Sequence, residues 1–277
     1  MRKQKIGALQ VLMGAICFSF AGVFTKWLPW SSWTLIGMRS ITCALLLGLA
    51  RKSFKPRISK GVLLGAVGMA VTGILFITAT KLTSAANAIV LQYAMPIVVI
   101  GLCWLVYKQK PSRTDSITAV CVLAGVILCS WEGITGGGGK LTGDLLALAS
   151  AVSYSLVFFC ARLPGTNALD YTYLGALMTL PFCIFACFDP AVSAEPVHWL
   201  AVAAMGMCLG GGYFFISRSL SNVHPVTSAL IANLEPVLNP LWVFLFLGED
   251  PGVYTIVGMV VVIVAVSIYS VVGLKEK

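Results

Sequence analysis

Residues 226–247 read VTSALIANLEPVLNPLWVFLFL, an apolar run with one ionisable side chain, Glu235. A helix of about 20 mostly apolar residues crosses the ~30 Å hydrocarbon core of a membrane, so this run predicts a membrane-spanning helix with Glu235 near its middle. Pro236 and Pro240 each remove a backbone donor, and we expect both to kink the helix. Carbonyls freed by a kink are tolerated in a membrane only where protein or water satisfies them, so the kinks predict a helix that borders a cavity.

The composition of the whole chain agrees with a membrane environment. Of its 277 residues, 58% are hydrophobic and only 10% are charged, whereas a soluble domain carries about 25% charged residues. The net charge of +9 would suit a nucleic-acid partner, but the basic residues stand in short clusters between apolar runs and form no aromatic-studded basic face. The sequence therefore predicts an all-α polytopic membrane protein that is surrounded by the lipid bilayer and does not bind nucleic acid.

Apolar segments of membrane-spanning length recur along the chain, separated by short polar breaks. They predict ten transmembrane helices, near residues 6–26, 33–50, 61–80, 85–106, 116–132, 141–161, 170–188, 197–217, 226–247 and 253–273. The breaks between them are too short to hold a separate soluble domain.

Lysine and arginine positions predict the orientation of these helices. If the N-terminus is cytoplasmic, every Lys and Arg between the spans or at their ends lies on the cytoplasmic side except Lys26, Lys81 and Lys140. Cytoplasmic loops carry an excess of positive residues. We therefore expect a multi-pass protein of the cell inner (plasma) membrane with both termini in the cytoplasm.

The two halves of the chain resemble each other. A shift of 136 residues places Gly7 on Gly143, and a shift of 140 places Pro96 on Pro236. Each copy holds five predicted helices, and because five is odd the second copy must enter the membrane upside down. The sequence thus predicts two inverted five-helix repeats joined by an external Gly-rich linker, with boundaries at 1–132, 133–140 and 141–277.

The segments TSAANAIVLQYAMP (83–96) and VTSALIANLEPVLNPLWVFLFLGED (226–250) resemble the EamA family of the drug/metabolite transporter superfamily. The LEP and LGE motifs of the second segment carry most of this resemblance, which covers essentially the whole chain. In the first half, Lys108 and Gln109 stand where the counterparts of Gly248 and Glu249 are expected. The resemblance implies a secondary transporter that exports or exchanges small metabolites, such as amino acids, related compounds or amphipathic cations, by alternating access.

Polar and aromatic residues inside the fourth and ninth predicted helices are candidates for the transport pathway. The kinks at Pro96, Pro236 and Pro240 favour a cavity beside these helices. An alternative for each amide is a hydrogen bond between helices. The candidates are Asn87, Gln92, Tyr93, Asn233 and Glu235 on these two helices, with Tyr154, Tyr213 and Phe214 as further lining residues.

Two charged residues inside the spans have two interpretations each. Glu235 either couples transport to protons or is a buried carboxyl that stabilises the fold. Arg39 either braces the structure or binds a substrate carboxylate, and a brace is the preferred interpretation. A charge at this depth is costly and should face protein or water.

Other function classes have weaker support. A passive channel or facilitator would show the same sequence signals. An intramembrane enzyme would need a nucleophile with its base or a metal cluster, but the only histidines are His198 and His224 and no HExxH or GxSxG motif occurs. We expect a non-enzymatic protein with a small-molecule substrate and no cofactor or metal. A monomer would suffice because one chain holds both repeats, and a dimer stays open.

Overall fold

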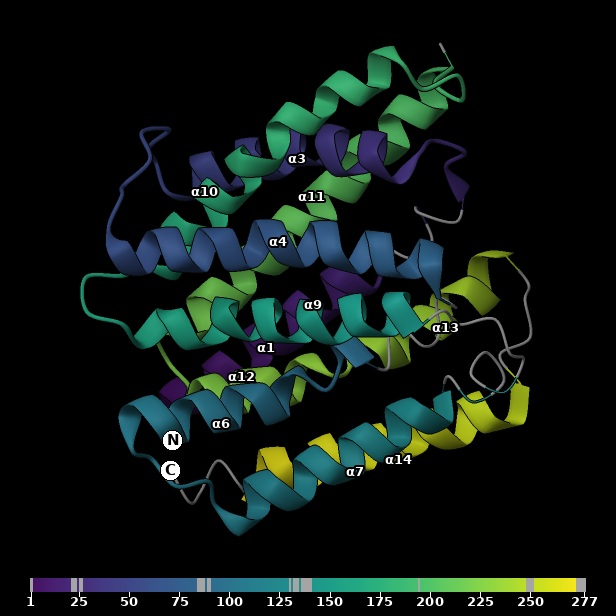
Figure 1. The fold of residues 1–277 in the computed structure, drawn as a ribbon. Helices are drawn as coiled ribbons and strands as arrows, with labels where there is room; N and C mark the ends of the chain where they lie inside the picture. Colours follow the sequence, from purple (N-terminus) through teal and green to yellow (C-terminus); the bar gives the residue numbers. More distant parts are fainter. Residues whose placement is uncertain are drawn as a thin grey trace.

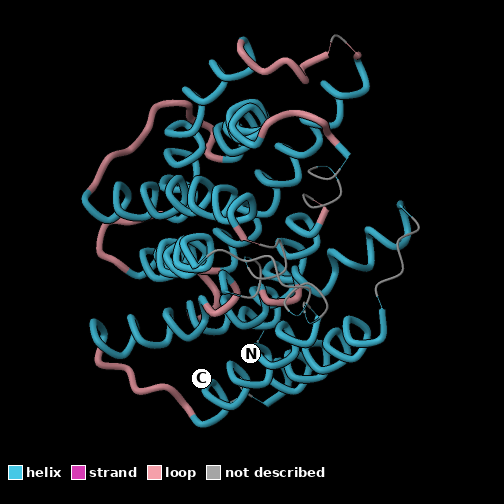
Figure 2. Tube along the Cα trace, turned by 45° about the vertical axis from the view of Figure 1, so that its right-hand side comes forward, coloured by secondary structure: helices cyan, strands magenta, loops and turns pink. Residues whose placement is uncertain are grey.

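The computed structural model describes residues 2–20, 24, 27–83, 88, 91–129, 131, 135, 141–193, 195–247 and 252–272. Within these ranges the regular structure is helical throughout, and no β-strand occurs there. The helices pack side by side as a bundle (Figures 1 and 2). The predicted all-α class is confirmed. Most of the predicted linker 133–140 lies outside the described residues.

The helices follow the apolar segments of the sequence. In the first half they are α1 (Arg2–Ser19), α3 (Ser32–Ala50), α4 (Lys60–Leu82), α6 (Met95–Tyr107) and α7 (Arg113–Cys129). In the second half they are α9 (Leu141–Phe159), α10 (Ala168–Thr179), α11 (Pro196–Ser219), α12 (Pro225–Ala232), α13 (Glu235–Leu247) and α14 (Gly252–Val272). Two 3-10 helices extend α9 and α10, namely η1 (Cys160–Arg162) and η2 (Leu180–Cys187).

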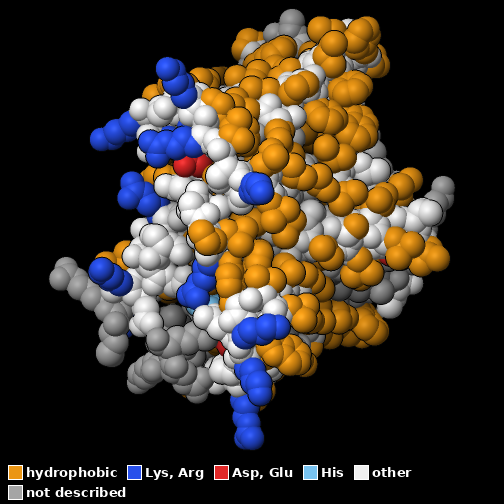
Figure 3. Space-filling model, turned by 60° about the vertical axis from the view of Figure 1, so that its left-hand side comes forward, with side chains coloured by type: hydrophobic (Ala, Val, Ile, Leu, Met, Phe, Trp, Pro, Cys, Tyr) orange, Lys and Arg blue, Asp and Glu red, His pale blue; other side chains and the backbone are white. Residues whose placement is uncertain are grey.

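The helix lengths and the surface identify a multi-pass membrane protein. Among the described residues, six helical segments are long and apolar enough to cross a membrane, and α6 is a shorter apolar helix. Large hydrophobic side chains face outward, among them Leu105 at 68% and Leu200 at 71% exposure. Figure 3 shows such side chains covering the flank of the bundle. The predicted count of ten spans goes beyond these six segments and stays a prediction.

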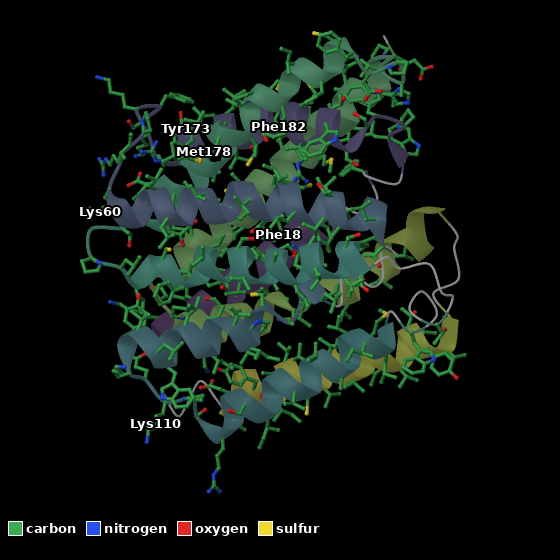
Figure 4. The ribbon with its side chains drawn as sticks, in the orientation of Figure 1. Phe18, Lys60, Lys110, Tyr173, Met178 and Phe182 are labelled. Atoms are coloured by element: carbon green, nitrogen blue, oxygen red, sulfur yellow. The ribbon has the colours of Figure 1, made fainter. Side chains whose placement is uncertain are left out.

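Basic side chains gather at one end of the bundle, which we call the basic end. The loops 51–59, 108–112 and 163–167 lie together there (Figures 1 and 2). Lysine and arginine side chains project from this end in Figure 3, and Lys60 and Lys110 point away from the bundle in Figure 4. The basic clusters that the sequence places in separate loops therefore form one surface.

A carboxylate at the opposite end of the bundle holds the start of α3. Asp189 accepts hydrogen bonds from the Ser31 backbone N–H at 2.6 Å and from the Thr34 hydroxyl at 2.7 Å. Partial burial opposes ionisation of Asp189, but these hydrogen bonds outweigh it and lower the pKa of its carboxyl to about 2. Asp189 therefore stays charged at physiological pH and ties α3 to the segment after η2.

Neighbouring helices of the two halves run in opposite directions. At the basic end, Gly61 at the start of α4 packs against Thr166 beyond the end of α9. At the other end, the hydroxyl of Thr83 donates to Asp144 of α9 at 2.7 Å. In the same way α1 is antiparallel to α11, and α7 is antiparallel to α14, where Tyr269 donates to Asp115 at 2.7 Å.

The contact between α3 and α11 depends on Gly206. A Cβ atom at this position would lie 2.1 Å from the Arg39 carbonyl oxygen and 2.0 Å from Thr42 Oγ1. Any side chain here would push the two helices apart. Gly206 therefore allows the close approach that small residues provide between membrane helices.

We expect Gly206→Ala to destabilise the protein by about 1–3 kcal/mol, because the added methyl group overpacks the contact between α3 and α11. Thermal unfolding of the purified protein measures the effect. Gly101→Ala in α6 is the matched control, since a Cβ there would meet nothing within 4 Å. Equal melting temperatures for both variants would contradict the close contact.

Candidate functional site

Two helices are interrupted at equivalent places in the two halves. The fourth predicted helix has a turn at residues 93–94 before α6, and the ninth has a turn at residues 233–234 between α12 and α13. These positions differ by 140, the shift that places Pro96 on Pro236. The segment expected as one kinked helix over 226–247 is therefore two shorter helices.

Proline explains where the second part of each interrupted helix begins. Pro96 and Pro236 lie in the first turn of α6 and α13. A proline is tolerated in the first turn of a helix because the missing N–H has no intrahelical acceptor there, and its ring disfavours helical geometry in the preceding residue. Pro240 lies further along α13, and the position of its side chain is outside the described part of the chain.

The side chains at the two turns face each other. Glu235 begins α13, and Tyr93 in the first turn donates a hydrogen bond to its carboxylate. Tyr93 is buried at 4% exposure. The Glu235 carboxylate thus has a partner inside the protein rather than in lipid, as a charged group at membrane depth requires.

Three further residues complete what we call the central polar cluster, which consists of Arg39, Tyr93, Tyr154, Tyr213 and Glu235. Tyr154 of α9 and Tyr213 of α11 are buried and lie within electrostatic reach of Glu235. Tyr213 is also within reach of Arg39 of α3. Five separate parts of the chain therefore bring their polar groups to one region.

Aromatic packing encloses this cluster. The rings of Phe18 and Tyr213 meet edge to face at 5.0 Å, and those of Tyr154 and Phe158 at 5.4 Å. Phe18 lies near the middle of the bundle in Figure 4. Such walls limit access of water to the cluster and strengthen the electrostatic interactions inside it.

Arg39 and Glu235 have opposite charges but do not pair with each other. Within the described residues, Arg39 forms no ion pair, and its buried Nε atom has no hydrogen-bond partner. Arg39 belongs to α3. Its guanidinium lies near Gly73 of α4, and its carbonyl oxygen lies against Gly206 of α11. The arrangement leaves a guanidinium with a free donor and a separate carboxyl group in one interior region.

Other predicted site residues have local partners or lie elsewhere. Gln92 donates to Ser150 at 3.3 Å, a bond between helices, and the amide nitrogen of Asn233 donates to the Ala229 carbonyl at 2.8 Å. The Asn233 oxygen is buried and has no partner within the described residues. Phe214 contacts Arg218, whose guanidinium lies 5.4 Å from its ring centre. Asn87 lies outside the described residues.

A cavity that the sequence did not predict opens at the basic end. Its volume is about 660 Å³, and it lies between α6, α7 and the start of α12. Hydrogen bonds between the two halves cross its wall, since His224 Nε2 and Gln109 Oε1 are 2.7 Å apart and Arg162 reaches the same Gln109 oxygen at 3.5 Å. The feature of the sequence that could have indicated this cavity is Asp115, one of the few acidic residues of the first half, which also lines it.

Side chains that could bind a metal ion do not cluster in the described residues. Across the described ranges, no group of three or more His, Cys, Asp or Glu side chains is placed to hold a metal ion. The chemistry available in the central polar cluster is therefore that of one carboxylate, one guanidinium and three phenols. These groups bind ions and polar molecules and exchange protons.

Comparisons with known proteins give a family and a fold. The sequence model of the EamA-like transporter family matches residues 5–131 and again 141–271. A solved structure, titled only as the crystal structure of a protein, is similar with a TM-score of 0.80 and 18% identity, and the alignment covers 98% of each chain. At this identity the similarity shows the fold alone. No match was found among curated proteins.

Proposed function

Because the chain belongs to the EamA-like transporter family, we propose that it is a secondary transporter that exports or exchanges small metabolites by alternating access. Amino acids, related compounds and amphipathic cations are the substrates to test first. In this proposal the chain crosses the membrane ten times as two inverted five-helix repeats, 1–132 and 141–277, joined by the external segment 133–140. One chain then contains a complete pathway, and a monomer suffices.

Helix directions support the inverted repeat. Gln4 at the start of α1 and Arg162 after the end of α9 line the same cavity at the basic end. The two helices that the shift of 136 residues makes equivalent therefore run in opposite directions. The same holds for the fourth and ninth helices, because α6 ends just before Gln109 whereas α12 begins just after His224, and both of these residues line that cavity.

The basic end supports the proposed orientation. Arginine and lysine side chains gather there, and positively charged loops are retained on the cytoplasmic side of a membrane. In this orientation both termini are cytoplasmic and the chain lies in the cell inner membrane. The 660 Å³ cavity then opens towards the cytoplasm.

One observation carries the proposed mechanism, namely the pair of interrupted helices that meet at Glu235. Interrupted helices at the midplane form substrate and ion sites in transporters because their free backbone groups and polar side chains face a cavity. We assign proton coupling to Glu235, and a pathway role to Gln92, Tyr93, Tyr154, Tyr213 and Asn233. A carboxylate that only stabilises the fold is the competing assignment.

Transport by purified protein in liposomes tests the proposal. Labelled amino acids, related metabolites and amphipathic cations are offered under an inward or outward pH gradient, or against internal substrate. We expect accumulation above equilibrium under one of these gradients. Movement that only equalises concentrations would support a passive facilitator instead, and no movement of any candidate would refute transport.

Tyr93→Phe should reduce the transport rate by about three- to tenfold, because it removes a hydrogen bond to the Glu235 carboxylate and keeps the ring. Transport should remain dependent on pH, since the carboxylate itself is still present. Tyr173→Phe is the control, because its hydroxyl donates to the Phe54 carbonyl at 2.8 Å, outside the cluster. Equal rates for both variants would remove Tyr93 from the site.

A further inference from the structure

A small cavity lies beside Arg39, where α3, α4, α10 and α11 meet. Its volume is about 30 Å³, enough for one water-sized particle or an ion such as chloride. Residues of all four helices line it, among them Arg39, Ser40, Gly73, Ala176, Thr179 and Tyr213. The cavity is separate from the larger one at the basic end.

Two groups that line this cavity can donate to a ligand, and one of them has an unused donor. The Nε atom of Arg39 is buried without a hydrogen-bond partner within the described residues, and Tyr213 lines the same cavity with a phenol that can donate. By contrast, the hydroxyls of Ser40 and Thr179 bond to each other at 2.8 Å and to carbonyls of their own helices. The donors available to a ligand therefore belong to a cation and a phenol.

The charge balance of the cavity calls for an anion. A guanidinium is always protonated and cannot relieve its burial by losing the proton. The residue is partly buried and its Nε atom fully so, and a buried charged donor without a partner is unfavourable. Glu235 does not supply the counter-charge, because its carboxylate pairs with Tyr93 and forms no ion pair with Arg39 in the described residues.

We propose that the Arg39 cavity binds one small monovalent anionic group through Arg39 and Tyr213. The group is either the carboxylate end of the transported metabolite or a free anion such as chloride. The first source rests on the proposed transport function, whereas the second does not. Both share the chemistry of a single negative charge that accepts N–H and O–H donors.

The cation of this site has no counterpart in the other repeat. A shift of 137, between the shifts that relate the flanking helices, places Arg39 on Ala176, and both residues line the cavity. A long side chain on α3 thus faces a methyl group on α10. This difference in size leaves the space that the anion occupies.

Thermal unfolding of the purified protein in detergent, followed by tryptophan fluorescence, tests the proposal without any transport. Sodium gluconate at fixed ionic strength is the background, and chloride or acetate replaces it stepwise. We expect a saturable rise in melting temperature with the small anion. Arg39→Gln should weaken the apparent affinity on the order of tenfold or more, because the charged donor is lost.

Gly73→Ala keeps Arg39 but fills its cavity. The new Cβ would lie 3.6 Å from Nη2 of Arg39, an ordinary contact, and nothing else comes within 4 Å. Alanine also favours a helix over glycine, so this variant should fold even if Arg39→Gln does not. We expect it to lose the anion effect, while Gly101→Ala, the same change in α6 with open space around it, keeps the effect.

The results separate the two sources and the two proposals. Stabilisation by chloride alone supports a free anion and overturns the carboxylate source, whereas acetate or a substrate carboxylate that competes with chloride supports the substrate. An absent effect, or an equal effect in wild type and Gly73→Ala, overturns the anion site and leaves the transport assay unaffected. Failed transport with an intact anion effect overturns the proposed function and the carboxylate source only.

Discussion

Glu235→Gln is expected to abolish accumulation driven by a pH gradient, leaving at most movement that equalises concentrations. Glutamine keeps the size of the side chain and can still bond to Tyr93, but it cannot release or take up a proton. Under an imposed pH gradient, the initial rate should fall about tenfold or more, which corresponds to at least about 1.4 kcal/mol. Transport by proteoliposomes at several pH values measures both effects.

The control for this variant is Glu195→Gln, which makes the same chemical change at a carboxylate that is 66% exposed outside the bundle. It should leave transport and its pH dependence unchanged. A Glu235→Gln protein that melts at a lower temperature but keeps the wild-type pH profile would show a structural carboxyl. Proton coupling would then need another group.

The sequence predicted the helices well where hydrophobic length alone decides the structure. The expected 33–50 and 61–80 helices correspond closely to α3 and α4. The expected helix over 170–188 corresponds to α10 followed by the 3-10 helix η2, which begins at Leu180 next to Pro181. A proline there removes a backbone donor of the α-helix, and that local effect does not alter hydropathy.

The sequence predicted the site only in part, because side-chain direction depends on how the helices are rotated against each other. The repeat brought Tyr93 and Glu235 together as candidates, and they form a hydrogen bond. It did not distinguish Tyr213 from Phe214, which are adjacent on α11 and point to different neighbours. Arg39 of α3 lies close to Tyr213 of α11. The spacing of residues within either helix does not reveal such a contact between two helices.

A buried ion pair at the basic end connects the two halves. Arg51 Nε donates to Asp170 at 2.6 Å, and their side chains are 4% and 9% exposed. The same guanidinium donates to the Ser53 carbonyl at 2.8 Å and lies 4.6 Å from the ring centre of Tyr173. The guanidinium therefore joins the end of α3, the loop 51–59 and the start of α10.

Asp170→Ala should destabilise the protein by about 3–5 kcal/mol, because it leaves the Arg51 guanidinium buried without its counter-charge. Thermal unfolding in detergent, calibrated by denaturant where unfolding is reversible, measures the loss. Glu195→Ala removes an exposed carboxylate and should change stability by no more than about 0.5 kcal/mol. A loss below about 1 kcal/mol for Asp170→Ala would mean that the pair is solvated in the membrane-bound protein.

The double variant Arg51→Met and Asp170→Leu separates the value of the pair from the penalty of breaking it. Apolar residues of similar size can replace a buried ion pair with little loss, because both charges avoid the cost of leaving water. We expect the double variant to regain most of the stability that Asp170→Ala loses. A double variant as unstable as Asp170→Ala would instead show that the bonds from Arg51 to the loop 51–59 stabilise this end, since methionine removes those donors together with the charge.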